Sequence, residues 1–84
     1  MIAYIFATCA PGGEKDAISK IKKLQNVVEV NGIIGRYDIF VKVSAKNETE
    51  LHAAITNIRD VDAIASTSTF SAIRGQGGSI DDEK

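Results

Sequence analysis

Residues 27–44 read VVEVNGIIGRYDIFVKVS, and this stretch decides the fold of the chain. Two runs rich in Val, Ile and aromatic residues, at 27–34 and 37–44, flank the pair Gly35-Arg36. Glycine supplies the positive φ that tight hairpin turns require. The pattern therefore predicts an antiparallel hairpin with its turn centred on Gly35 and Arg36.

Each arm of this hairpin is followed or preceded by the pattern of a helix and then of a further strand. Apolar residues at three- and four-residue spacing predict an amphipathic helix at 14–24, with acidic residues in its first turn and lysines in its last. A second helix begins at Asn47, which can accept a hydrogen bond from a first-turn amide while Glu50 reaches back, as in a capping box. Residues 2–9 and 61–73 are rich in β-forming residues and predict two more strands.

The predicted order is strand, helix, strand, strand, helix, strand. Because strand crossovers are right-handed, two βαβ halves joined by a hairpin fold into one sheet with both helices on one face. The sequence thus predicts an α+β protein with the ferredoxin-like βαββαβ arrangement. Residues 1–74 are expected to form one domain, and the Gly-rich, then acidic residues 75–84 a flexible tail.

The first predicted strand is apolar on both of its sides, which alternate as Ile2, Tyr4, Phe6 and Thr8 against Ala3, Ile5, Ala7 and Cys9. In the strand at 37–44 the same alternation places Tyr37 on one side with Ile39 and Val41. A sheet with one solvated face would carry polar residues there. We therefore expect the second face to be covered as well, by an identical sheet in a homodimer.

The composition excludes several classes of protein. Ten Lys and Arg against eleven Asp and Glu give a formal net charge of −1, without the basic excess that binding to DNA phosphates requires. No apolar run approaches the roughly 20 residues of a membrane span, and the first residues lack a signal-peptide pattern, so we expect a cytoplasmic protein. One cysteine and one histidine form no metal cluster, and no cofactor is predicted. Cys9 is expected to pack as a small hydrophobic residue and His52 to face solvent.

Polar groups gather at the predicted hairpin tip, in Gly35-Arg36-Tyr37-Asp38. Asp38 can pair with an ammonium group while amides of the turn bind a carboxylate, which is the minimum chemistry for recognising a free α-amino acid. The alternative is a polar hairpin in which Asp38 is hydrogen-bonded to its own turn. As an exposed carboxylate, Asp38 is expected to contribute little to stability. No catalytic motif is present, so no catalytic residue is predicted and the chain is not expected to be an enzyme.

The stretch at 28–43, followed by a capped helix and then by residues 61–70, resembles the effector-binding domain of the AsnC/Lrp family of feast/famine regulators, also called the RAM domain. Gly35-Arg36-Tyr37-Asp38 before an apolar strand is the most specific part of the resemblance. In that family the domain is a βαββαβ unit that dimerises through its sheets into an α/β barrel. Dimers assemble into tetramers or octamers, and amino-acid effectors bind between dimers near this hairpin.

The resemblance implies that Gly35, Tyr37 and Asp38 bind a small effector such as a free amino acid, with Thr67 and Thr69 as weaker candidates. It also implies a homo-oligomer, with full-length regulators of the family as a further class of partner. Such regulators carry an N-terminal helix-turn-helix domain, and no residue precedes Met1 here. We therefore expect a stand-alone effector domain that modulates transcription regulators and contacts neither DNA nor a membrane.

Two other interpretations stay open from the sequence. Dimeric α/β barrels also host cofactor-independent monooxygenases and similar small enzymes, which would need a polar or His-bearing cavity inside the barrel. An ACT-type amino-acid-binding domain has the same order of elements but pairs its subunits side by side. It would form one continuous intersubunit sheet.

Overall fold

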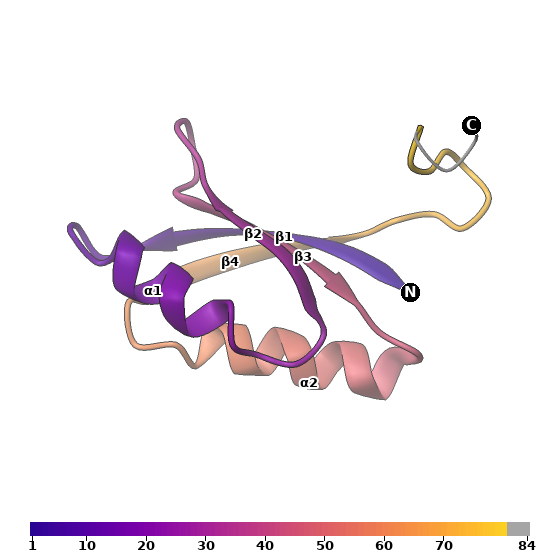
Figure 1. The fold of residues 1–84 in the computed structure, drawn as a ribbon, viewed down its shortest axis with the longest axis horizontal. Helices are drawn as coiled ribbons and strands as arrows, with labels where there is room; N and C mark the ends of the chain where they lie inside the picture. Colours follow the sequence, from indigo (N-terminus) through magenta and orange to yellow (C-terminus); the bar gives the residue numbers. More distant parts are fainter. Residues whose placement is uncertain (81–84) are drawn as a thin grey trace.

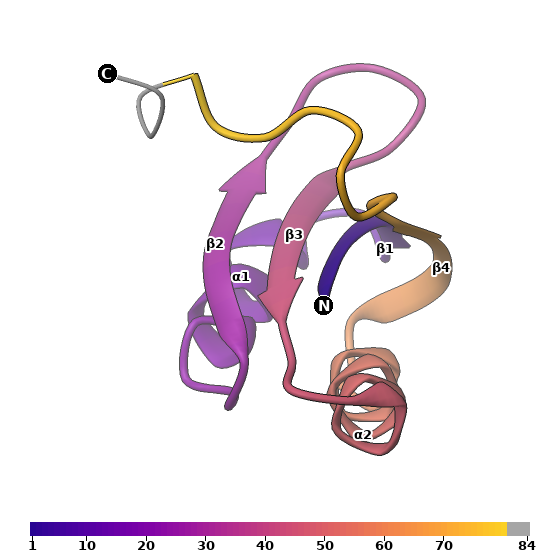
Figure 2. The same cartoon turned by 90° about the vertical axis from the view of Figure 1, so that its right-hand side faces the viewer.

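The computed structural model describes residues 1–80 and contains six elements in the predicted order. They are β1 (Ile2–Cys9), α1 (Glu14–Ile21), β2 (Val27–Gly32), β3 (Ile39–Ser44), α2 (Glu48–Arg59) and β4 (Ile64–Ser71). The strands form one antiparallel sheet in the order β2-β3-β1-β4, and both helices lie on the same side of it (Figures 1 and 2). The ferredoxin-like βαββαβ fold is confirmed. Neither of the helices within residues 1–80 is long and apolar enough to cross a membrane.

Strand β1 lies in the middle of the sheet, and one of its faces forms the centre of the core. Ala3, Ile5 and Ala7 have 0% exposed surface on the side that carries the helices. The buried residues of β3 lie opposite them in register, and the helices close the core with Ala17, Ile21, Leu51, Ala54 and Ile58. Burial of each large aliphatic side chain contributes about 1.5–3 kcal/mol to folding. The core is thus built where the sequence pattern puts its helix-facing residues.

The other face of the sheet carries all five aromatic residues of the chain: Tyr4, Phe6, Tyr37, Phe40 and Phe70, which form the aromatic face. The ring centre of Phe6 lies 5.5 Å from Tyr37, 5.4 Å from Phe40 and 6.0 Å from Phe70. Neither helix covers this face (Figures 1 and 2). The prediction that β1 is apolar on both sides is therefore confirmed, and among residues 1–80 no helix packs on the rings.

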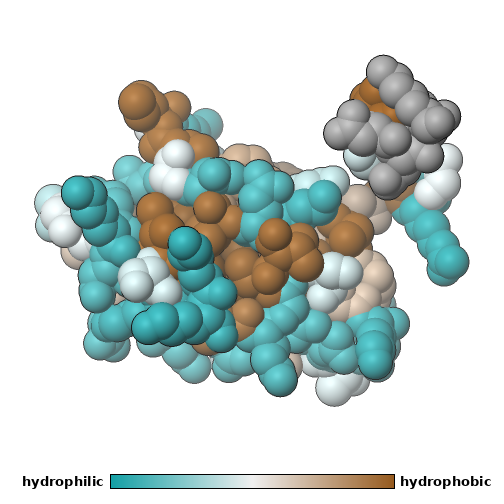
Figure 3. Space-filling view, viewed as in Figure 1, coloured by the Kyte–Doolittle hydropathy of each residue, from teal (hydrophilic) through white to brown (hydrophobic). Residues whose placement is uncertain are grey.

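The hairpin between β2 and β3 is centred as predicted, but its loop is longer than a tight turn. The last pair of the ladder is Gly32 with Ile39, so residues 33–38 form the loop. At the end of the loop, the N–H of Asp38 donates to the carbonyl of Ala7 at 2.9 Å, and this bond holds the loop to β1. Hydrophobic side chains protrude from this loop (Figure 3), and Ile34 is fully exposed.

The alternation predicted for Tyr37 is wrong. Because β3 begins only at Ile39, Tyr37 belongs to the loop and is not bound by the strand's alternation. Its ring packs on Phe6 of the aromatic face, on the opposite side of the sheet from Ile39 and Val41.

Besides the two hairpin strands, two further predicted elements are shorter than expected. Helix α1 ends at Ile21, because the N–H groups of Lys23 and Leu24 bond to carbonyls only three residues back and Asn26 then takes a φ of 74° to enter β2. Strand β4 spans Ile64–Ser71 instead of 61–73, since the turn that follows α2 occupies the first of those residues. Residues 75–80 hold neither helix nor strand, while residues 81–84 of the predicted tail lie outside the described residues.

Of the two hydrogen bonds predicted for the cap of α2, the one accepted by Asn47 is found and the one from Glu50 back to Asn47 is not. The side-chain oxygen of Asn47 accepts a hydrogen bond from the N–H of Glu50 at 2.8 Å. The carboxylate of Glu50 does not return to Asn47: it accepts from the N–H of Lys46 at 3.2 Å and from Nδ2 of Asn26 at 2.6 Å. Asn26 also donates to the carbonyl of Ser44 at 2.9 Å. The start of α2 is thereby tied to the entry of β2 and the end of β3.

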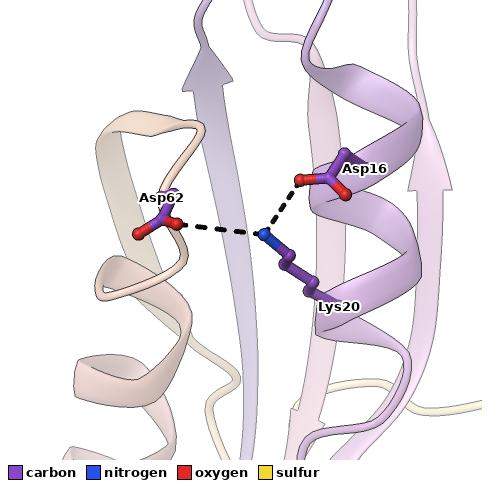
Figure 4. A network of polar contacts seen from close by, with 3 residues as sticks. All are labelled: Asp16, Lys20 and Asp62. Carbon is purple, nitrogen blue, oxygen red and sulfur yellow. Dashed lines mark ion pairs between the residues drawn. The ribbon is translucent and has the colours of Figure 1, made fainter.

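A lysine of α1 links this helix to the turn that follows α2 at the surface. Nζ of Lys20 lies 3.0 Å from Asp16 within α1 and 3.9 Å from Asp62 in the turn before β4 (Figure 4). The hydrogen bond to Asp16 is the main cause that raises the pKa of Lys20. Because these side chains are largely exposed, solvent screens the pairs and they contribute little to stability.

Replacing the capping residue should destabilise the domain measurably. We expect Asn47→Ala to lower the free energy of unfolding by about 1 kcal/mol, because the N–H of Glu50 loses its acceptor. In urea denaturation the midpoint should fall at an unchanged slope. Asn47→Asp, which keeps the acceptor, is the control, and equal losses in both variants would contradict the capping role.

Candidate functional site

Polar side chains meet at the end of the sheet beside the β2–β3 loop. Oδ2 of Asp38 accepts a hydrogen bond from the N–H of Cys9 at 3.0 Å. The hydroxyl of Tyr37 lies 3.3 Å from Oγ of Ser68, so the loop is bonded to β1, which neighbours β3, and to β4 on the far side of β1. Gly35 is exposed at the tip of the loop with a φ of 150°. Gly35, Tyr37, Asp38 and Ser68 together are called the hairpin site.

The carboxylate of Asp38 is half-buried, so the expectation of an exposed hairpin carboxylate is wrong. The alternative in which it bonds to its own turn is wrong too, because its partner is an amide of β1. One oxygen of the carboxylate is thus fixed by the backbone. The hairpin site therefore presents a positioned negative charge beside a phenol and a serine hydroxyl, which suits a ligand that carries an ammonium group.

Cys9 lies next to Asp38, and its surroundings do not favour a reactive thiol. It packs against the core, and burial followed by the negative charges of Glu14 and Asp38 raises the pKa of its thiol. A raised pKa keeps the thiol neutral and a poor nucleophile. His52 is exposed on α2, as predicted. Among residues 1–80 no three His, Cys, Asp or Glu side chains come together in a way that could hold a metal ion.

Thr67 and Thr69 lie apart from the hairpin site. They pair with Ala7 and Ile5 of β1, and both line a groove between β4 and α2, on the helix side of the sheet. This groove, the β4 groove, has a volume of about 580 Å³ and is lined by Ile55, Arg59, Ile64, Ala65, Ser66, Thr67 and Thr69. The five predicted site residues therefore form two groups, one in the β2–β3 loop and one in the β4 groove, and Tyr37 lies on the opposite face of the sheet from Thr67 and Thr69.

Sequence reasoning missed two residues of these regions, Ser68 and Arg59. The alternation of Thr67 and Thr69 against Ser68 along β4 separates the two faces, and this signal is present in the sequence. The bond from Ser68 to Tyr37 depends on the conformation of the 33–38 loop, which the alternation does not specify. Arg59 ends α2, and only the packing of this helix beside β4 places it in the groove.

Comparisons with known proteins agree with this architecture. The family model for the Lrp/AsnC ligand binding domain matches residues 2–75. The crystal structure of FFRP-DM1 superposes with a TM-score of 0.81 at 34% sequence identity, covering 86% of this chain and 97% of that chain.

Two kinds of curated protein contain a similar segment. The HTH-type transcriptional regulator FL11 of Pyrococcus furiosus is 27% identical over 74 residues, which cover 88% of this chain and 49% of the regulator. The homocitrate synthase of Sulfurisphaera tokodaii is 40% identical over 68 residues, which cover 80% of this chain and 15% of the enzyme. The chain thus spans about half the length of the regulator and a small part of the synthase.

Because of the hydrogen bond between Asp38 and Cys9, we expect two substitutions of Asp38 to differ in their effect on stability. Asp38→Ala leaves the half-buried N–H of Cys9 without its acceptor and should cost about 1 kcal/mol of unfolding free energy. Asp38→Asn retains an acceptor oxygen and should cost distinctly less. Chemical denaturation of the two variants measures the difference, and wild-type stability in Asp38→Ala would show that the bond contributes nothing.

Proposed function

The chain belongs to the family of Lrp/AsnC ligand-binding domains, which serve regulation, and we propose that its effector is a free α-amino acid. The observation that carries this proposal is the position of Asp38 in the hairpin site. Its carboxylate is fixed by the amide of Cys9 and lies beside Tyr37, in a loop whose tip is the exposed Gly35. The carboxylate supplies the partner for an α-ammonium group, and exposed backbone amides of the loop supply donors for an α-carboxylate.

We further propose that the effector is bound between copies of the domain. Tyr37 lies on the opposite face of the sheet from Thr67 and Thr69. A ligand the size of an amino acid cannot reach through a sheet to touch both groups. If all of these residues bind one effector, two subunits must therefore contribute to the site.

The aromatic face supports a homodimer as the basic unit. Its five rings form one continuous cluster that neither helix covers, and Phe70 is 57% exposed. A second aromatic face is the complementary surface that a two-fold axis supplies. Assembly of such dimers into tetramers or octamers would then bring hairpin sites near the grooves of neighbouring subunits.

The regulator and the synthase that contain a similar segment suggest two classes of partner for this domain. The match to an HTH-type regulator supports a module that modulates transcription regulators in the cytoplasm. The match to a homocitrate synthase has a higher sequence identity, 40% against 27%, and favours as a second candidate the control of a biosynthetic enzyme. In both cases the domain binds an effector and performs no reaction itself.

A thermal-shift screen against the twenty amino acids tests the proposed effector class. A ligand at about 100 times its dissociation constant should stabilise the fold by about 2.7 kcal/mol. For a domain of this size that corresponds to a rise in Tm of roughly 10 °C or more. The D-enantiomer of each amino acid that binds is the matched control. A flat response to all twenty would contradict an amino-acid effector and leave the fold assignment intact.

Sedimentation analysis tests the proposed homodimer. Phe70→Glu places a charge on the aromatic face and should shift the chain toward monomer, because an unpaired charge in an apolar interface is costly. Val28→Glu is the matched control, since Val28 on edge strand β2 is also 57% exposed but lies outside the aromatic face. A monomeric wild type at micromolar concentration, or equal behaviour of both variants, would contradict dimerisation through this face.

A further inference from the structure

The dipeptide Asn31-Gly32 lies within the stretch that decides the fold, but it does not form a turn. Asn-Gly is a strong signal for a two-residue hairpin turn, because both residues accept a positive φ. In the structure both residues belong to β2, and Gly32 does not take a positive φ. Within residues 1–80, a Cβ at Gly32 would meet only Cδ1 of Ile18, at 3.4 Å. Neither the backbone nor the packing therefore requires glycine at this position.

The backbone nitrogen of Gly32 is accessible from the edge of the sheet. The N–H of Ile33 donates to the carbonyl of Asp38 at 2.9 Å, toward the β3 side of the hairpin. Backbone groups alternate in direction along a strand, so the N–H of Gly32 points the opposite way, to the outer edge of β2. β2 is the last strand on this side of the sheet, and both Asn31 and Gly32 are exposed. The nitrogen of Gly32 thus lies outside the ladder and has no Cβ beside it.

The side-chain amide of Asn31 is exposed as well. Its Nδ2 donates to Oε2 of Glu29 at 2.8 Å. When glycine follows an asparagine, no side chain obstructs the approach of the next backbone nitrogen to the carboxamide carbon. Gly32 is the final residue of β2, and strand ends open more readily than strand centres. The backbone at Asn31 can therefore rotate into the reactive geometry while the domain stays folded.

We propose that Asn31 is a site of spontaneous deamidation and isomerisation, with Gly32 as the internal nucleophile. The backbone nitrogen of Gly32 forms a bond to Cγ of Asn31, and the bond from Cγ to Nδ2 breaks. The proton of the Gly32 N–H passes through water to the leaving nitrogen, which departs as ammonia. Water then adds to either carbonyl of the resulting succinimide and opens it to aspartate or isoaspartate. Each event consumes one water and releases one ammonia, without oxidation or reduction.

Both products change the end of β2. The new carboxylate cannot donate to Glu29, so a hydrogen bond is replaced by two negative charges on the same side of the strand. Isoaspartate also adds one carbon to the backbone between residue 31 and Gly32. The hydrogen bond from Ile33 to Asp38 lies directly beyond this point. The isomer should therefore disturb the start of the β2–β3 loop, whether or not that loop binds an effector.

Peptide mapping of the full chain by mass spectrometry, after prolonged incubation at neutral pH, tests this site. Residue 31 should gain a carboxylate and accept a methyl group from an isoaspartyl methyltransferase. Asn26, Asn47 and Asn57 are each followed by a residue with a larger side chain and should stay intact. Gly32→Ala is the matched control and should react severalfold more slowly, because its Cβ obstructs the attacking nitrogen. Melting of the fresh variant shows that it folds.

Nuclear magnetic resonance of the aged chain measures the effect on the loop. The amide signals of Ile33 and Asp38 should shift in the isomerised fraction, and unchanged signals would overturn the predicted disturbance of the loop. An Asn31 that stays intact through the incubation, or equal rates in wild type and Gly32→Ala, would overturn the modification site itself. Reaction only in the urea-unfolded chain would do the same, because the site is assigned in the folded domain.

Discussion

Strand β1 carries apolar side chains on both of its faces, and the other strands and the helices are arranged around it. Its small and aliphatic residues Ala3, Ile5 and Ala7 are completely enclosed by the helices and by β3. Its other face presents Tyr4 and Phe6 to a cluster of rings that no helix covers. A single sheet with one helical layer can satisfy only the first of these faces. In the proposed homodimer the second face would be covered by its copy, which would tie the function of this domain to its assembly.

Strand β4 connects the two regions that the proposed function uses. Its consecutive residues alternate between the faces, so Ser68 bonds to Tyr37 while Thr67 and Thr69 line the β4 groove. The strand is held to the sheet on one side only, by β1. Under the proposed function, effector binding and subunit packing would thus share one structural element.

The sequence predicts most of this fold because local chemistry and the hydrophobic pattern agree. The bounds of β1 and the start of α2 at Asn47 follow from strand alternation and a side-chain cap, and both are found in the structure. The conformation of residues 33–38 does not follow, because a six-residue loop is set by its bonds to β1 and β4 and not by its own residues. That is why Tyr37 lies on the opposite face of the sheet from the one that strand alternation predicts.

For the candidate site, Tyr37 and Asp38 are neighbours in the chain and could be grouped from the sequence. The separation of Thr67 and Thr69 from them, and the presence of Arg59 beside them, depend on strand register and helix packing.

Native mass spectrometry of the chain, recorded with and without the twenty amino acids, tests whether an amino-acid effector is held between subunits and not within one. The spectra should show bound amino acid on dimers or larger assemblies and none on the monomer. An amino acid bound to the monomer, or assemblies that carry no ligand under any condition, would contradict binding between subunits.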